Sequence, residues 1–277
     1  MSIYFFLLKT SFEQLNEMNL KFIKIGSGDT NNIEMMSYIA MQKTPLIVST
    51  GMQTEATVIK VHDILNAGNV NFALLHCISS YPTSIEDTKL NYIKRYQTMF
   101  PETTIGYSGH ESNSAITLLA VLMGAKIIER HFTIDKSQKG SDHSLSLTPD
   151  EMKDLITKIR FIEKIQVAEN ILEIVTKNKL FLDPEEVILK ACEPVVERII
   201  FPCELDCKNK LGKSLVYTKN LPLGHTLSST DITIKVSEPY GIPAEYFEDA
   251  INKTLSHDVF ADKAIETTDI SEILSHF

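Results

Sequence analysis

The stretch PLIVSTGMQTEATVIKVHDILNAGNVNFALLHC, residues 45–77, contains two apolar, β-branched runs separated by a segment with helical spacing. The runs are PLIVST (45–50) and FALLHC (72–77). The segment between them opens on Thr54, which can cap a helix, and closes on Gly68, a residue typical of helix ends. The stretch therefore predicts a strand–helix–strand unit with parallel strands.

The same alternation continues on both sides, with further apolar runs at 3–6, 21–25, 104–108 and 126–132. Strands buried on both faces read as continuous apolar runs of this kind. Polar residues gather at their carboxyl ends, namely Lys24, Ser27, Ser49, Tyr81, Ser108, Glu129 and His131. A (β/α)8 TIM-type barrel builds its site from the loops after every strand, whereas a doubly wound sheet gathers ligands at one switch point. We therefore expect the barrel.

Six βα units can be counted, whereas a closed barrel of this type has eight. We therefore expect an α/β fold that lacks about two N-terminal βα units. Residues 1–166 are predicted to form this partial barrel, ending in a capped helix from Thr148 to about Ile165. Residues 167–210 are predicted to be a linker with an atypical, irregularly helical insertion, and residues 211–277 a small β-rich domain.

Composition limits the class of partner. The net charge of -9 and the pI of about 5.4 argue against a broad surface for nucleic acid or for an anionic membrane. The longest apolar stretch, residues 115–125, is shorter than the roughly 20 residues that span a bilayer. The N-terminus has no basic residue before its apolar run, so a signal peptide is not expected. Four unevenly placed cysteines suit reduced thiols, and we expect a cytoplasmic protein.

Two strand ends carry ionisable side chains with a spacing of two. Glu129 and His131 share one face of a strand, as do Ser108 and His110, because strand side chains alternate. Two imidazoles from neighbouring strand ends can converge on a metal ion or handle a proton. The alternative, in which each histidine only pairs with loop carbonyls, stays open at this point.

Several motifs add a resemblance to a known family. KIGSGDTNN (24–32), STGMQT (49–54), LLHCISSYPT (74–83), GYSGHES (106–112) and ERHFTIDKSQKGSDHSLSL (129–147) resemble the sialic acid synthases, closest in form to the animal N-acetylneuraminate-9-phosphate synthases. KLGKSLV (210–216) and the module after it resemble their C-terminal antifreeze-like (SAF) domain. The resemblance implies condensation of phosphoenolpyruvate with N-acetylmannosamine or its 6-phosphate, with release of phosphate.

The resemblance also implies roles for individual residues. His110 and His131 match the ligands of a divalent ion, Mn²⁺ or Mg²⁺, and Glu129 beside them could assist proton transfer. Substrate-binding positions are matched by Lys24, Ser27, Ser49 and Ser108 for phosphoenolpyruvate, by Glu129 and Asp142 for the sugar, and by Ser79 and Tyr81 in the same pocket. A homodimer is implied, in which the C-terminal domain covers the partner's site and Lys235 and Tyr240 occupy the aligned positions.

Other polar residues have simpler interpretations. Arg130 lies on the opposite face from Glu129 and is expected to pair with a helix carboxylate, and His76 is expected to be a core histidine. His143 lies in a loop that could close over the site. In the family the first two βα units carry a glutamate and a lysine of the active site, which cannot be assigned here. A catalytically inactive remnant or gene-model fragment that binds sugar and phosphate is therefore the alternative to an enzyme.

Overall fold

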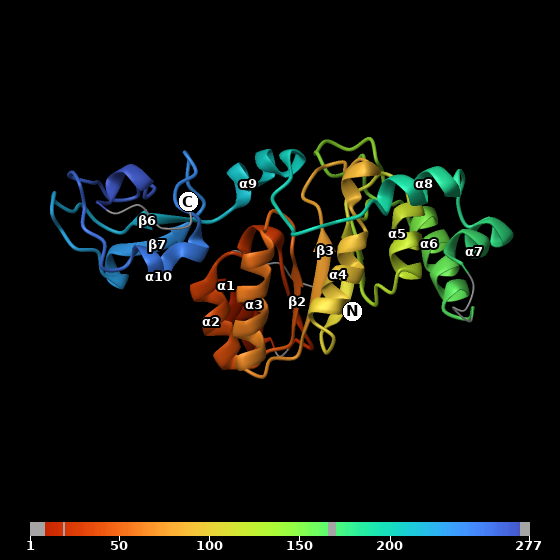
Figure 1. Ribbon diagram of the computed structural model, residues 1–277, viewed down its shortest axis with the longest axis horizontal. Coiled ribbons are helices and arrows are strands. Elements are labelled where there is room, and N and C mark those ends of the chain that lie inside the picture. The colour runs from red at the N-terminus through yellow and green to blue at the C-terminus, as the bar shows by residue number, and fades with distance from the viewer. Residues whose placement is uncertain (1–8, 19, 166–169, 272–277) are drawn as a thin grey trace. The chain divides into compact units, whose positions relative to one another are not determined.

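The computed structural model describes residues 9–18, 20–165 and 170–271 (Figure 1). Its strands are β1 (Ile23–Ile25), β2 (Leu46–Ser49), β3 (Phe72–Cys77), β4 (Thr104–Gly109), β5 (Ile128–Arg130), β6 (Ser214–Tyr217) and β7 (Ile232–Lys235). Its α-helices are α1 (Lys9–Glu17), α2 (Ile33–Gln42), α3 (Glu55–Ala67), α4 (Asn91–Met99), α5 (Ala115–Leu122), α6 (Pro149–Ile162), α7 (Ile171–Asn178), α8 (Pro184–Ala191), α9 (Leu205–Leu211) and α10 (Phe247–Ala250).

The chain divides into two compact units. The central unit comprises residues 47–51 and 72–199, and the terminal unit comprises residues 1–46, 52–71 and 200–277. The terminal unit is therefore built from segments far apart in the sequence.

Five strands form one sheet in the order β1-β2-β3-β4-β5, and the ladders of β3 with β4 and of β4 with β5 are parallel. A helix follows each of the first four strands, as a barrel of βα units requires. The predicted strands at 21–25, 45–50, 72–77, 104–108 and 126–132 are confirmed, and the run at 3–6 lies outside the described residues. Five parallel strands of the barrel type are thus present in the described part of the chain.

The predicted helix ends are also observed. The Thr54 side chain accepts a hydrogen bond from the Thr57 amide at 3.2 Å at the start of α3. At the start of α6, Thr148 Oγ1 accepts from the Glu151 amide, and Glu151 Oε2 accepts from the Thr148 amide at 2.8 Å. Both caps satisfy amides that have no partner within their helices, and both predictions are confirmed.

The segment after α6 contains the helices α7 and α8, and it supplies buried side chains to the central unit. Ile174 and Val175 of α7 pack with Leu118 of α5 and Leu155 of α6 in one apolar cluster. In Figure 1 the helices α5, α6, α7 and α8 lie next to one another. Residues 171–191 are therefore an integral helical layer of the central unit rather than an irregular connection.

The end of this segment is anchored by Arg198, whose side chain is fully buried. Its guanidinium lies 5.8 Å from the centroid of the Tyr92 ring and 3.5 Å from the Cys77 carbonyl oxygen, and it also donates to the Ile199 carbonyl. Tyr92 in turn donates from its hydroxyl to the Glu197 carbonyl at 3.1 Å. A cation over an aromatic face, excluded from water, holds residues 197–199 against β3 and α4.

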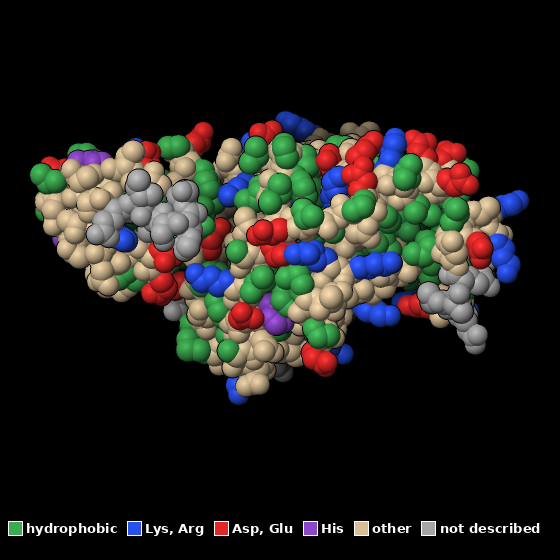
Figure 2. Space-filling view, viewed as in Figure 1, with side chains coloured by type: hydrophobic (Ala, Val, Ile, Leu, Met, Phe, Trp, Pro, Cys, Tyr) green, Lys and Arg blue, Asp and Glu red, His purple; other side chains and the backbone are tan. Residues whose placement is uncertain are grey.

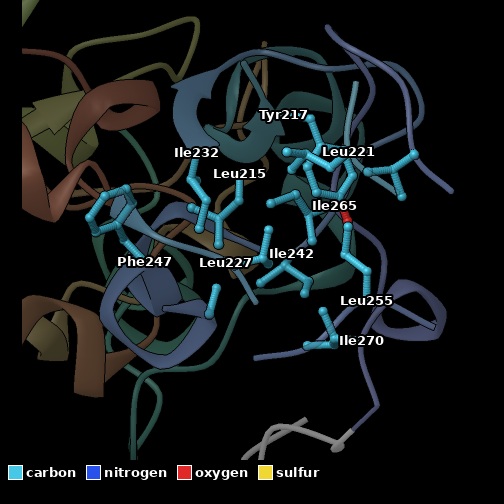
Figure 3. Packing of buried hydrophobic residues seen from close by; sticks show 12 residues of the cluster. Leu215, Tyr217, Leu221, Leu227, Ile232, Ile242, Phe247, Leu255, Ile265 and Ile270 are labelled. Carbon is cyan, nitrogen blue, oxygen red and sulfur yellow. The ribbon is translucent and has the colours of Figure 1, made fainter. Parts of the chain in front are cut away.

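The C-terminal domain has its own core within the terminal unit. Strands β6 and β7 pair antiparallel, with Leu215 opposite Ile234 and Tyr217 opposite Ile232, and single bridges join the remaining extended segments. Figure 3 shows side chains from these segments converging, among them Leu215, Leu227 and Ile265. The predicted β-rich texture thus consists of two short regular strands and several isolated bridges around a continuous apolar cluster.

On the face drawn in Figure 2, Lys and Arg side chains are interspersed with Asp and Glu side chains. The charged surface of this face is therefore mixed rather than a single acidic patch. Among the described residues, no helix combines the length and the apolar character needed to span a bilayer.

Candidate active site

The two histidines predicted to converge lie at the carboxyl ends of neighbouring strands. His110 directly follows β4 and His131 directly follows β5, and the last residues of the two strands, Gly109 and Arg130, are register partners. The ring centroids of His110 and His131 are 5.3 Å apart, and the rings are inclined at 74°. Parallel pairing therefore brings together at one edge two imidazoles that lie 21 positions apart in the sequence.

Tyr81 joins this pair from the loop after β3. Its ring centroid lies 4.1 Å from that of His110, with an interplanar angle of 38°, and 5.9 Å from that of His131. We refer to Tyr81, His110 and His131 as the aromatic triad. Three consecutive strand ends thus each contribute one ring to the same place.

The environment keeps both imidazoles neutral. Burial lowers the pKa of His110, and its Nδ1 lies 2.7 Å from the Ile78 carbonyl oxygen, so Nδ1 carries the proton and donates it. Burial, and after it the neighbouring His110, lowers the pKa of His131. A neutral imidazole whose Nδ1–H is held by a carbonyl presents the lone pair of Nε2, which is the form that binds a metal.

Glu129 and Ser108 form a hydrogen-bonded pair beside the triad. They are register partners on β5 and β4, and Ser108 Oγ donates to Glu129 Oε1 at 3.0 Å. Asp142 approaches from the following loop, with its Oδ2 at 3.5 Å from His131 Nδ1. The central unit therefore brings together Ser108, Glu129 and Asp142 with the two histidines.

The other predicted site residues are located as follows. Ser79 in the loop after β3 and Ser49 at the end of β2 are both buried. Lys24 and Ser27 belong to the terminal unit, where Lys24 is buried in β1 and donates from Nζ to the Ile25 carbonyl at 2.6 Å. Ser27 opens the short 3-10 helix η1 (Ser27–Asp29), and its carbonyl accepts from the Gln53 side chain at 2.8 Å.

The expectation for Arg130 was only half right. The side chain does pair with a carboxylate, at 2.9 Å between Nη1 and Oε1, but the partner is Glu111, which lies in the loop between β4 and α5 rather than on a helix. The same carboxylate accepts from the hydroxyls of Tyr107 at 2.9 Å and Thr117 at 2.6 Å. Sequence reasoning missed Glu111, although it directly follows His110 within the GHES motif.

Two further histidines are accounted for. His76 is fully buried, its Nε2 lies 2.7 Å from the Thr88 carbonyl, and its ring lies between 5.6 and 6.4 Å from those of Tyr92, Tyr96 and Tyr107. The expectation of a core histidine is confirmed. His143 Nδ1 lies 2.8 Å from the Thr133 hydroxyl, so its ring links two points of the loop that carries Asp142.

The residues present fit a divalent ion that takes only part of its ligands from the protein. Metal–nitrogen bonds of about 2.1 Å are within reach of two neutral rings at this spacing. Among the described residues, no group of three or more His, Cys, Asp and Glu could enclose a metal. The two imidazoles alone would therefore supply the protein's ligands to such an ion.

In the C-terminal domain, Lys235 and Tyr240 lie in different surroundings. Lys235 is about half exposed and pairs with Asp262 at 2.6 Å. Tyr240 donates to the Lys213 carbonyl at 3.3 Å, and the ammonium of Lys208 lies 5.4 Å from its ring centroid. Tyr240 is therefore engaged with its own chain.

The described residues form a sheet of parallel βα units of the TIM type with imidazoles at its strand ends, and a small β-rich domain follows in the sequence. The NeuB family model matches residues 7–170, and the SAF domain model matches residues 212–271. The chain belongs to the NeuB family of sialic acid synthases.

Individual relatives agree with this. The chain is 47% identical over 256 residues to N-acetylneuraminate-9-phosphate synthase of Drosophila melanogaster, covering 92% of this chain and 68% of that protein. The human protein of the same name is 40% identical over 253 residues, which cover 91% of this chain and 63% of that protein. The mouse protein is 42% identical over 233 residues, which cover 84% of this chain and 57% of that protein. The chain thus spans 57–68% of the length of these curated relatives.

The chain is also similar to solved structures. The spore coat polysaccharide biosynthesis protein SpsE of Bacillus subtilis aligns with a TM-score of 0.78 at 27% identity, covering 97% of this chain and 72% of that one. An N-acetylneuraminic acid synthetase from Leptospira borgpetersenii aligns with a TM-score of 0.54 at 32% identity, covering 61% of each chain. The first alignment extends over the barrel strands and the C-terminal domain alike.

Proposed function

We propose that this protein is a sialic acid synthase that condenses phosphoenolpyruvate with N-acetylmannosamine 6-phosphate. C3 of phosphoenolpyruvate bonds to the aldehyde carbon of the sugar, water adds at C2, and inorganic phosphate leaves, giving a nine-carbon 2-keto acid 9-phosphate. The phosphorylated sugar is proposed as the acceptor because the three animal relatives are named N-acetylneuraminate-9-phosphate synthases. The observation that carries the proposal is the 5.3 Å spacing of His110 and His131 at neighbouring strand ends.

His110 and His131 are proposed to hold a divalent ion, Mn²⁺ or Mg²⁺. Such an ion, when bound, polarises a carbonyl oxygen as a Lewis acid. The Ile78 carbonyl fixes the tautomer of His110, and the Tyr81 ring at 4.1 Å fixes the plane of the imidazole. The lowered pKa values of both rings favour the neutral form that a metal ligand needs.

The remaining roles are proposed for residues around this pair. Glu129, hydrogen-bonded to Ser108, is proposed to hold or move the proton that the aldehyde oxygen gains. Lys24, Ser27, Ser49 and Ser108 are proposed to bind phosphoenolpyruvate, the lysine by charge and the hydroxyls by directed hydrogen bonds. Asp142 is proposed to contact the sugar, and Ser79 and Tyr81 are proposed to line the same pocket.

Dimerisation and location follow from the same proposal. We propose a homodimer in which the C-terminal domain covers the partner's site, with exposed Lys235 as the reaching side chain. A cytoplasmic location suits the substrates, which are small phosphorylated metabolites. Size measurement in solution tests the first statement, and cell fractionation tests the second.

The decisive experiment is incubation of the native full-length protein with phosphoenolpyruvate, Mn²⁺ and either N-acetylmannosamine 6-phosphate or N-acetylmannosamine, with phosphate and 2-keto acid both measured. We expect equal amounts of both products, faster with the phosphorylated sugar. Glu129→Gln should lower kcat by about 10²–10⁴-fold. Calorimetric binding of phosphoenolpyruvate without phosphate release would instead establish the alternative, a non-catalytic binding protein.

A further inference from the structure

The η1 turn, which follows the lysine of β1, is held by a buried ion pair with the C-terminal domain. Lys213 Nζ lies 2.9 Å from Asp29 Oδ1, and the two side chains are only 5% and 2% exposed. The same ammonium donates to the Gly28 carbonyl at 3.0 Å. One side chain of the C-terminal domain therefore contacts two consecutive residues of the turn that Ser27 opens.

The charge of Asp29 makes this contact important for the conformation of the turn. Burial raises the pKa of Asp29, and the positive charges of Lys213 and, after it, Lys24 oppose the rise. If Lys213 is lost, the buried carboxylate keeps its desolvation cost and loses its nearest cation. The turn must then open to water or draw Lys24 toward Asp29, and either change displaces a residue proposed to bind phosphoenolpyruvate.

A second set of contacts lies around Glu245. Asn31 Nδ2 donates both to the Lys213 carbonyl at 2.9 Å and to Glu245 Oε2 at 2.8 Å. Lys60 of α3 donates to the Glu245 carbonyl at 2.7 Å. Glu245 therefore connects Asn31, which follows η1, to Lys60 of α3. Within the terminal unit, the C-terminal domain thus contacts the N-terminal segments at more than one point.

Gly28 of η1 lies close to the backbone of Leu211, the last residue of α9. A Cβ atom built at this position would lie 2.9 Å from the Leu211 carbonyl oxygen and 3.2 Å from Leu211 Cβ. A contact of 2.9 Å to a backbone atom cannot be relieved by a rotamer change, so a side chain at position 28 would push η1 and residue 211 apart.

We propose that Lys213 and Glu245 of the C-terminal domain are positioning residues for phosphoenolpyruvate, because they hold the η1 turn and with it Lys24 and Ser27 of the same chain. The inference rests on the proposed function and adds to it a role for the C-terminal domain within its own subunit. The inference distinguishes the two substrates. Loosening η1 affects binding of the enol phosphate and leaves the residues proposed for the sugar, Glu129 on β5 and Asp142 in the loop after it, unchanged.

The test compares Lys213→Met, Asp29→Asn and the double variant with Lys210→Met, a matched control that removes an exposed lysine three residues away. We expect Lys213→Met to raise KM for phosphoenolpyruvate about tenfold or more, with KM for the sugar within about twofold. The double variant, which removes both charges, should recover most of this loss, because no unpaired buried charge remains. Lys210→Met should resemble the wild type.

Hydrogen–deuterium exchange of peptides covering residues 23–32 supplies a readout that needs no turnover. We expect faster exchange in Lys213→Met and in Gly28→Ala, and unchanged exchange in Lys210→Met. Unchanged exchange in Lys213→Met would overturn the inference whether or not the protein is an enzyme. Faster exchange with a rise in both KM values together would assign Lys213 a general structural role and would also overturn it. Absence of phosphate release from the wild type would count against the proposed function alone.

Discussion

Glu111 and Arg130 form a buried ion pair, and each is the immediate sequence neighbour of a histidine of the aromatic triad. Glu111 follows His110, Arg130 precedes His131, and the two side chains are 2% and 1% exposed at a separation of 2.9 Å. Arg130 Nη1 also donates to the Asn113 carbonyl at 3.0 Å and to Thr117 Oγ1 at 2.8 Å. The pair thus fastens the loop after β4 to the end of β5, which sets the spacing of the two imidazoles.

Arg130→Met should lower the free energy of unfolding by about 3–5 kcal/mol, because it leaves the Glu111 carboxylate buried without its cation. Urea denaturation measures the change. Lys136→Met is the control, since Lys136 pairs with Glu151 on the surface at 2.7 Å and such pairs contribute about 0.2–1 kcal/mol. Equal losses in the two variants would show that the buried pair does not stabilise the loop.

His131→Ala should weaken binding of Mn²⁺ at least about 100-fold. Loss of a residue that only orients a metal ligand typically costs about 10–100-fold, and loss of a ligand should cost more. Calorimetry with the metal alone measures this without turnover, and dialysis against a chelator should abolish phosphate release until Mn²⁺ or Mg²⁺ is restored. His62→Ala on α3 serves as the control; if it weakens Mn²⁺ binding as much as His131→Ala, the pair is not the metal site.

His76 should make stability depend on pH in the acid range. Burial lowers its pKa from 6.5 to about 3, so between these values the unfolded chain binds a proton that the folded chain does not. Ionisation of His76 therefore does not reduce the free energy of unfolding above about pH 6.5. On acidification below that pH it lowers the free energy of unfolding by up to about 1.4 kcal/mol per pH unit. His76→Gln, which keeps a donor for the Thr88 carbonyl, should flatten the loss of urea stability between about pH 7 and pH 5. An unaltered slope contradicts the assignment.

Leu215→Ala should destabilise the C-terminal domain by about 2–5 kcal/mol, since the side chain is fully buried in the cluster of Figure 3. Thermal unfolding followed by circular dichroism measures the effect. Leu223→Ala removes a side chain that is 64% exposed and should change the free energy of unfolding by less than about 0.5 kcal/mol. A similar shift in both variants would mean that the cluster does not form the domain's core.

The sequence predicted the parts of this fold that local patterns encode. Apolar runs identified the five described strands of the sheet, and Thr54 and Thr148 identified two helix starts, because strand burial and capping depend on neighbouring residues. The i, i+2 spacing at Ser108–His110 and Glu129–His131 indicated which side chains share a face. Parallel pairing of the adjacent strands β4 and β5 is then enough to bring His110 and His131 close together.

What could not be predicted depends on long-range contacts. Glu111 reads as a solvated loop residue, and only the fold brings Arg130 to it. Arg198 lies in a mostly apolar stretch, PVVERIIFP (194–202), in which a charged residue reads as solvent-exposed, yet it is fully enclosed beside Tyr92. Lys213 contacts Asp29 across more than half of the chain, and such pairings leave no local periodicity to detect.

The discontinuous make-up of the terminal unit has a consequence for biogenesis. During translation, residues 72–199 leave the ribosome as a nearly continuous block and can collapse early, whereas the η1 turn has to wait for residues 200–277 before Asp29 acquires its cation. Nascent chains stalled before Lys213 should therefore carry a hydrated, protease-accessible segment around residue 29 that becomes protected only after Lys213 has emerged.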